Sequence, residues 1–242
     1  MDSNHKNYDY IASFDRIDEL LAQPRGNYEE VESLPDRDML TYTNGFYAYC
    51  SALFIDIRDS SALPDVYNRP ALAKLYRAYI SEMVAIVNGL TQTREVNIVG
   101  DGVWAVFNTP KKSDINSVFS AACRVNTLVK VLNHKLKHAQ YDTPIAVGIG
   151  MAYGRALMIK AGYNGSGISD VIYMGDVVNR SAKLAAEGSK GPGTPPMMID
   201  NVFANNLDAH RTSLITKDRQ RGCYTANAIN TAMNDWYNAN CT

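Results

Sequence analysis

The sequence has no excess of charge of either sign. Its 242 residues include 24 Lys and Arg and 25 Asp and Glu, which gives a formal net charge of −1 at pH 7. Nucleic acids and anionic membrane surfaces are bound mainly through clustered positive charge. The balance therefore argues against partners of either kind, and any phosphate binding is expected to be local.

Long apolar runs are also missing. No run approaches the roughly 20 residues that a membrane-spanning helix needs. The polar start, residues 1–8, lacks the basic and then apolar order of a secretory signal. These absences predict a cytoplasmic protein that does not enter a membrane.

Cysteine is scarce, with 4 residues in the chain. They are too widely scattered for a zinc knuckle or a disulfide framework, so we expect reduced thiols. Apolar residues, in contrast, are plentiful at 46% of the chain. This composition excludes intrinsic disorder and provides for a substantial core.

Hydrophobic periodicity predicts an α+β fold. In chain order the expected elements are a buried strand over 46–57, a helix from Pro70 to Gly89, strands over 94–99 and 102–107, a helix over 114–136 and a strand from 145. This order is that of the ferredoxin-like βαββαβ unit, an antiparallel sheet with both helices on one face. Asp101 then lies at the tip of a hairpin.

Extensions are expected on both sides of this unit. Residues 1–40 contain a short amphipathic helix, in which Phe14, Ile17, Leu20 and Leu21 share a face that we expect to pack. Residues 41–200 form the central domain. It ends with a strand over 171–174, a helix over 176–186 and a strand over 197–199. Residues 201–242 are expected to form a strand or arm that packs on the same domain.

Asp56 and Asp101 are the most informative pair, because each ends an apolar strand. Neighbouring strands in the split fold bring the two carboxylates together, where they can hold a pair of divalent ions with the Ile57 carbonyl. In the other interpretation, Asp56 caps the next turn and Asp101 is an ordinary hairpin residue. The pattern alone leaves both open.

A short polar turn follows Asp56. Arg58, Ser60 and Ser61 precede the first helix, and small residues in such a turn offer backbone N–H groups to a phosphate. We therefore expect these three residues to bind substrate. Two metals beside a phosphate cradle suit phosphoryl transfer.

Three segments resemble motifs of the class III nucleotidyl cyclases, the adenylate and guanylate cyclase family. They are FIDIRDSS at 54–61, VGDGVWAVF at 99–107 and YMGDVVNRSAKL at 173–184. Asp59 and Ser60 replace the usual Gly and Phe of the first motif. The resemblance implies a class III catalytic domain in which Asp56, the Ile57 carbonyl and Asp101 hold two Mn²⁺ or Mg²⁺ ions.

The third segment implies two catalytic residues. Asn179 would orient the ribose, and Lys183 stands where the family has an Arg that stabilises transition-state charge. A Lys keeps the positive charge but loses the bidentate fork. The resemblance also implies a homodimer, with the metals on one chain and Asn179 and Lys183 on the other.

Base selection in the family depends on two positions, held here by Asn97 and Ile172. Adenine selection uses Lys and Asp at these places, and guanine selection uses Glu and Cys, so neither purine pair is present. Asn97 shares strand parity with Asp101. Its amide offers a donor and an acceptor to a base edge.

The whole chain resembles, more narrowly, the pyrimidine cyclases of bacterial Pycsar anti-phage systems. This implies conversion of UTP to 3′,5′-cyclic UMP and diphosphate, and a product that activates a separate effector. CTP or ATP as substrate stays an alternative, as does a non-catalytic nucleotide sensor. An RNA-binding split-fold module is disfavoured by the neutral charge. Lys217, Arg219 and Arg221 belong either to the phosphate site or to a solvated hairpin.

Overall fold

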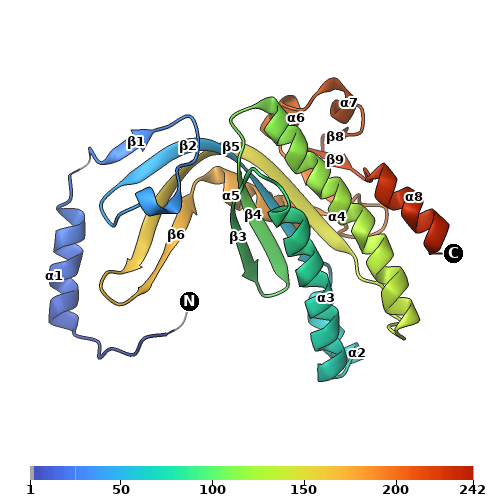
Figure 1. Cartoon of the computed structure of the whole chain (residues 1–242), viewed down its shortest axis with the longest axis horizontal. Coiled ribbons are helices and arrows are strands. Elements are labelled where there is room, and N and C mark those ends of the chain that lie inside the picture. Colours follow the sequence, from blue (N-terminus) through green and yellow to red (C-terminus); the bar gives the residue numbers. More distant parts are fainter. Residues whose placement is uncertain (1–2, 25, 242) are drawn as a thin grey trace.

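The computed structural model describes residues 3–24 and 26–241, and these form one large curved sheet with helices on both faces (Figure 1). The central strands are β2 (Gly45–Ile57), β3 (Thr93–Val99), β4 (Gly102–Asn108) and β5 (Val147–Tyr163). They run in the order β3-β4-β2-β5 with every neighbour antiparallel. The predicted α+β fold with a βαββαβ order is confirmed.

Helices α3 (Arg69–Asn88) and α4 (Lys112–His138) cover one face of this sheet. The start of α3 is fixed locally, because the Asn68 side chain accepts a hydrogen bond from the backbone N–H of Ala71 (3.0 Å) and Pro70 occupies the first turn. Gly89 follows its last residue. Both predicted helices therefore lie where their periodicity places them.

Helix α5 (Asp176–Glu187) packs on the opposite face, directly against β5. A Cβ atom at Gly150 would lie 2.0 Å from the carbonyl oxygen of Ser181, and one at Gly148 would lie 2.0 Å from that of Ala185. Only glycine permits so close an approach of helix and strand. These two glycines thus set the position of α5.

The complete sheet is mixed, because strands outside the antiparallel βαββαβ unit add two parallel pairs. β1 (Tyr28–Glu30) runs parallel to β2, and β7 (Met197–Ile199) runs parallel to β5. β6 (Ile168–Met174) forms a hairpin with β5. The prediction missed the parallel pairs because they depend on crossover connections, such as the one that α5 makes before β7.

The expected packing of the N-terminal helix is wrong. No side chain of α1 (Tyr10–Leu21) is buried, and Phe14 and Leu21 are 56% and 80% exposed. Figure 1 shows α1 at one end of the molecule, beside the β5–β6 hairpin, where the Arg16 guanidinium lies 4.7 Å from the ring centroid of Tyr163. An apolar stripe predicts a helix, but only the tertiary structure decides whether a surface covers it.

The rest of the N-terminal extension is integrated into the sheet. After β1 comes the short 3-10 helix η1 (Arg37–Met39), and Leu34 and Leu40 on either side of it are buried. They join the core cluster on the α5 face of the sheet. Residues 28–40 are thus held against the sheet, unlike α1.

The C-terminal segment continues the sheet and then runs along α4. Its elements are α6 (Asn201–Asn205), α7 (Ala209–Thr212), β8 (Thr216–Asp218), β9 (Cys223–Ala226) and α8 (Thr231–Asn240). β9 pairs with β7, and β8 forms the last hairpin with β9. The sequence did not predict α8.

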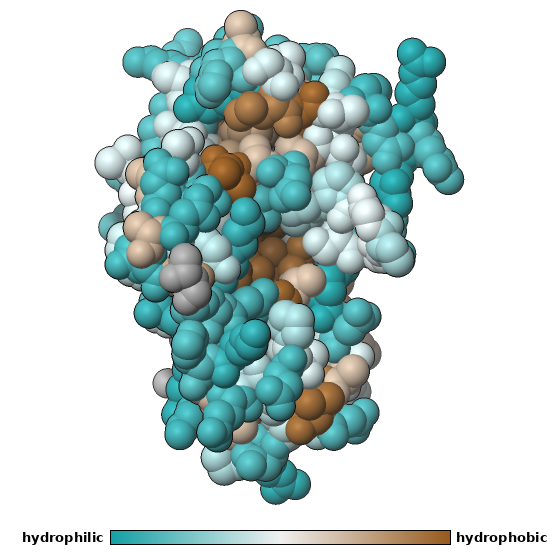
Figure 2. Space-filling view, turned by 90° about the vertical axis from the view of Figure 1, so that its right-hand side faces the viewer, coloured by the Kyte–Doolittle hydropathy of each residue, from teal (hydrophilic) through white to brown (hydrophobic). Residues whose placement is uncertain are grey.

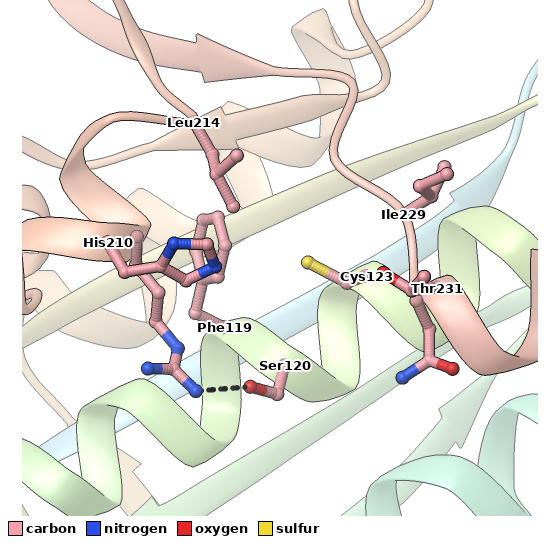
Figure 3. A pocket seen from close by; sticks show the side chains of 9 residues that line it. Phe119, Ser120, Cys123, His210, Leu214, Ile229 and Thr231 are labelled. Carbon is pink, nitrogen blue, oxygen red and sulfur yellow. Dashed lines mark hydrogen bonds between the residues drawn. The ribbon is translucent and has the colours of Figure 1, made fainter.

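A small pocket lies where this segment meets α4 (Figure 3). Arg211 donates a hydrogen bond to Ser120 Oγ (3.0 Å) at its rim, and the pocket measures about 150 Å³. Small-molecule sites usually enclose 300 Å³ or more. We therefore regard this pocket as a packing feature of the C-terminal segment.

Figure 2 views the molecule from the side that carries α8 in Figure 1, and shows a mostly hydrophilic surface with small apolar patches. An apolar groove between α4 and α8 is lined by Leu128, Val131, Ala232, Met233 and Trp236.

Within the described ranges, no helix combines the length and apolar character that a bilayer span requires. Cys50, Cys123, Cys223 and Cys241 are all free thiols.

Candidate active site

The structure brings the carboxyl groups of Asp56 and Asp101 together. Asp56 is near the end of β2, and Asp101 lies in the turn between β3 and β4. Burial raises the pKa of Asp56, and the nearby charge of Asp101 raises it further. Asp101 Oδ2 is buried without a hydrogen-bond partner. Such an unpartnered oxygen, in a pair of carboxylates, fits a cation ligand.

Arg58 is a neighbour of this acidic pair. Its Nη2 donates to Asp56 Oδ2 at 2.6 Å, and its Nη1 donates to the carbonyl oxygen of Ala186 at 2.9 Å. The side chain is 15% exposed. The sequence predicts a substrate contact for Arg58, but here its guanidinium connects the acidic pair to the end of α5.

The turn after Arg58 adopts a left-handed backbone at Asp59, with φ of 54°. This is the position at which the family motif has Gly, and Asp is one of the few other residues that adopt this conformation. Ser60 is half-buried and Ser61 exposed, at the start of the 3-10 helix η2 (Ser60–Ala62), which leads into α2 (Leu63–Val66). Asp59 in place of the usual Gly therefore keeps the same turn, and the backbone N–H groups at the start of η2 stay available.

A second group of polar residues lies on the outer side of α5. Asn179 and Lys183 are exposed, one helical turn apart, and line a cavity of about 380 Å³. Arg221, from the turn between β8 and β9, lines the same cavity, and its Nη1 donates to Asp218 Oδ2 at 2.8 Å. Arg221 thus adds a guanidinium beside Lys183.

The three basic side chains of residues 217–221 have different surroundings. Lys217 contacts the side chains of Asn201 and Tyr224, and Arg219 is exposed outside the cavity. Only Arg221 of the three lines it. The sequence could not separate the three because strand and turn geometry decides which side chain faces α5.

The acidic pair lies outside the cavity that Asn179 and Lys183 line. The residues that line the cavity beside α5 include neither Asp56 nor Asp101. Each chain therefore presents an acidic half-site and, separately, a half-site with Asn179, Lys183 and Arg221.

Asn97 lies on β3 opposite Trp104 of β4, whose ring stacks on Phe54 of β2. The two rings are parallel within 1°, with centroids 5.5 Å apart. Because cross-strand partners share a sheet face, Asn97 adjoins a partly exposed aromatic surface that leads towards Asp56. The alternation of side chains along β2 and β4 could have predicted that Phe54 and Trp104 share a face with Asn97, but the sequence analysis missed these two aromatic residues.

Ile172, the other predicted base-selecting residue, lies on β6. Its side chain is 42% exposed, whereas the neighbouring Tyr173 is 7% exposed. The Tyr173 hydroxyl is buried without a hydrogen-bond partner, and burial raises its pKa. In the described residues, no hydrogen bond joins Ile172 and Asn97.

An ion-pair cluster lies near Asn97. Glu95 of β3 is 7% exposed, and Arg37 Nη1 donates to both of its carboxylate oxygens, at 2.9 and 2.8 Å. Arg37 also bonds Asp170 of β6. A Glu inside an otherwise apolar strand indicates that a buried partner is needed. The sequence could not identify that partner, because Arg37 is 58 residues away.

Comparison with known proteins establishes the class. Residues 44–192 match the adenylate and guanylate cyclase catalytic domain. The chain therefore belongs to the class III nucleotide cyclase family.

Two relatives carry a more specific name than the family does. The chain is 47% identical over 190 residues to the uridylate cyclase of Gulbenkiania mobilis, covering 76% of this chain and 73% of that protein. It is 36% identical over 236 residues to the uridylate cyclase of Treponema porcinum, covering 96% and 81%. Among solved structures, the adenylyl cyclase CyaB from P. aeruginosa matches with a TM-score of 0.63 and 19% identity, covering 76% of this chain and 95% of that one. The last likeness concerns the fold alone.

Proposed function

We propose that this protein is a uridylate cyclase that converts UTP to 3′,5′-cyclic UMP and diphosphate. The observation that carries the proposal is the approach of Asp56 and Asp101, with a buried unpartnered oxygen, in a chain 47% identical to a uridylate cyclase. Cyclisation joins the ribose 3′-oxygen to the α-phosphorus and breaks the bond to the diphosphate.

The acidic half-site is proposed to hold two divalent cations, Mn²⁺ or Mg²⁺, through Asp56, Asp101 and the Ile57 carbonyl. When bound, such cations supply Lewis acidity towards the 3′-hydroxyl and the phosphates. In the described residues, no cluster of three or more Asp, Glu, His or Cys side chains is arranged to hold a metal ion. This fits Mg²⁺-type sites, which use one or two carboxylates together with substrate phosphates.

The other half-site is proposed to hold the ribose and the phosphates. Asn179 orients the ribose, and Lys183 and Arg221 supply positive charge to the transition state and the leaving diphosphate. Ser60 and Ser61 offer backbone N–H groups to the triphosphate. Since the two half-sites open separately, we propose a homodimer in which each active site combines one half from each chain.

Arg221→Ala is expected to lower kcat/KM for UTP by about 30-fold, the usual loss when one charge-assisted hydrogen bond to phosphate is removed. Steady-state kinetics would measure it. Arg219→Ala is the matched control, because it removes the same charge from the same turn outside the cavity. Equal kinetics for Arg221→Ala and wild type would exclude Arg221 from the phosphate site.

Asn97 and Ile172 are proposed to contact the base. The Asn97 amide hydrogen-bonds to a base edge, and the aromatic surface of Trp104 and Phe54 adjoins it. A pyrimidine ring is smaller than a purine, which suits a site without either purine-selecting pair. CTP is the alternative substrate, since the amide of a free Asn pairs with either pyrimidine.

The proposed activity is tested by incubating the protein separately with UTP, CTP, ATP and GTP in the presence of Mn²⁺ and identifying products by mass spectrometry. We expect cyclic UMP as the main product. Cyclic CMP or cyclic AMP as the main product would replace the proposed substrate. Nucleotide binding without turnover would instead establish a sensor.

A biological role follows from the proposed product. We propose that cyclic UMP acts as a second messenger in anti-phage defence and activates a separate effector protein. We also propose a cytoplasmic location, where nucleoside triphosphates are available as substrate. The relatives named uridylate cyclase support the product on which both proposals depend.

A further inference from the structure

The cavity beside α5 contains a third cationic side chain, to which the proposed function gives no role. Arg180 lines this cavity together with Lys183 and Arg221. Residues three apart on a helix are neighbours on its surface, so Arg180 and Lys183 lie on the same side of α5. Lys183 offers a point charge, whereas Arg180 offers a planar fork of N–H donors.

Arg180 is anchored by a buried carboxylate. Its Nε forms an ion pair with Oδ1 of Asp200, whose side chain is 3% exposed. Asp200 Oδ2 accepts hydrogen bonds from the backbone N–H groups of Val202 (2.9 Å) and Phe203 (3.4 Å). The backbone N–H of Asp200 donates to the carbonyl oxygen of Met151 (2.8 Å). These bonds hold Asp200 against the start of α6 and against β5, so it gives the guanidinium a fixed position.

The anchor leaves the far end of the guanidinium open. Among the residues that the structure describes, neither Nη atom of Arg180 has an ionic or hydrogen-bond partner, and the side chain is 49% exposed. Asp200, in contrast, is not part of the cavity lining. The two Nη atoms of a guanidinium match two oxygens of one phosphate. Arg180 can therefore bind a phosphate in the cavity while its Nε stays with Asp200.

The acidic residues of the cavity do not occupy this fork. Asp176 and Glu187 belong to the lining. Glu187 lies 2.9 Å from Lys190 Nζ and 3.9 Å from Arg221 Nε. Over residues 3–24 and 26–241, the one ion pair of Arg180 is that with Asp200. The open end of Arg180 is thus available to an anion.

We infer that Arg180 is a catalytic residue that contacts the phosphates, and that Asp200 is the positioning residue that holds it. In the cyclisation, a bond forms between the ribose 3′-oxygen and the α-phosphorus. The bond from the α-phosphorus to the β-phosphate oxygen breaks, its electron pair leaves with the diphosphate, and the 3′-hydroxyl proton passes to solvent. Arg180 stabilises the charge that develops on the diphosphate. The inference rests on the proposed function, in which this half-site binds the phosphates.

Arg180→Gln removes the guanidinium. We expect kcat/KM for UTP to fall by about 100-fold, mostly in kcat, because two charge-assisted hydrogen bonds to the leaving group are lost. Arg211→Gln is the matched control. Arg211 also pairs with an Asp that caps a short helix, Asp208 of α7, but it lies outside the cavity. Its steady-state kinetics should equal those of wild type.

Moving the guanidinium separates a phosphate contact from a structural ion pair. Lys183→Arg, added to Arg180→Gln, returns a fork to the same side of α5 and should restore activity at least tenfold. It cannot restore an ion pair with Asp200. Arg180→Lys keeps a positive charge beside Asp200, which protects folding, but loses the fork, so we expect kcat/KM to fall by about tenfold.

A double-mutant cycle tests whether Asp200 acts through Arg180. Asp200→Asn keeps an oxygen that can cap α6 and removes the charge that anchors the guanidinium. We expect kcat/KM to fall by about tenfold. Combined with Arg180→Gln, it should cause no further loss, because the anchored group is already gone.

Binding of inorganic diphosphate reports the contact without turnover. Measured by calorimetry in the presence of Mg²⁺, its affinity should fall about tenfold in Arg180→Gln and stay at the wild-type value in Arg211→Gln. Wild-type affinity in Arg180→Gln, or no recovery of activity on adding Lys183→Arg, would overturn the inference. A wild-type protein that binds diphosphate through Arg180 but forms no cyclic nucleotide would overturn only the proposed function.

Discussion

Replacing Asp101 with Asn is expected to lower kcat by about 1000-fold, the scale of several kcal/mol of lost transition-state stabilisation. The same change should make the cation-free protein slightly more stable. Asp56 has a raised pKa partly because the Asp101 charge lies close to it. An amide at position 101 removes that repulsion and can donate to Asp56, so we expect a rise in Tm of about 2 °C. Kinetics and thermal unfolding without cations would measure the two effects.

Asp59→Asn is the matched control for this experiment. It removes a carboxylate three residues from Asp56, at an exposed position whose left-handed backbone Asn also adopts. We expect near wild-type activity. Added Mn²⁺ should raise the Tm of the wild-type and Asp59→Asn proteins but not that of Asp101→Asn. Undiminished turnover in Asp101→Asn would contradict the assignment of the acidic half-site.

Two inactive variants are expected to restore each other's activity when co-expressed. Asp101→Asn damages the acidic half-site, and Asn179→Ala damages the half-site on α5, each with a loss of about 100-fold or more. In a symmetric dimer, a mixed pair contains one site with both defects and one with neither. Random pairing makes half of the dimers mixed, so activity should return to about a quarter of wild type.

Co-expression of Asp101→Asn with Asp56→Asn is the control for this experiment. Both changes lie in the acidic half-site, so no combination of chains rebuilds an intact site, and the mixture should stay inactive. Recovery should depend on protein concentration, because dimers dissociate on dilution. A mixture of Asp101→Asn and Asn179→Ala that stays inactive would show that each active site lies within one chain.

Local signals carried most of the fold. Asn68, Pro70 and Gly89 mark the ends of α3, and the sequence therefore placed it within about one residue. Gly100, with φ of 62°, and Asp101 form the turn that the sequence assigned to the β3–β4 hairpin. These features depend on residues close together in the chain, which is why they could be predicted.

Contacts between distant segments of the chain could not be predicted as well from the sequence. The exposed stripe of α1 has the same periodicity as a buried one, and its sequence does not show whether another surface covers it. The parallel strands β1 and β7 depend on where distant segments meet β2 and β5. Arg37 lies in the N-terminal segment, which we expected only to extend the domain. Its ion pair with Glu95 connects this segment to β3 in the central sheet.

The sequence by itself determined the order of the central strands and helices and predicted that Asp56 and Asp101 lie close together. Apolar periodicity and turn residues act between near neighbours, and three ordered motifs identified the family. Only the tertiary structure decided that Arg58 bonds Asp56, that Arg221 and not Arg219 joins Lys183, and that the buried Glu95 pairs with Arg37. Those choices depend on sheet curvature and on side chains that meet across many residues, and no local pattern encodes them.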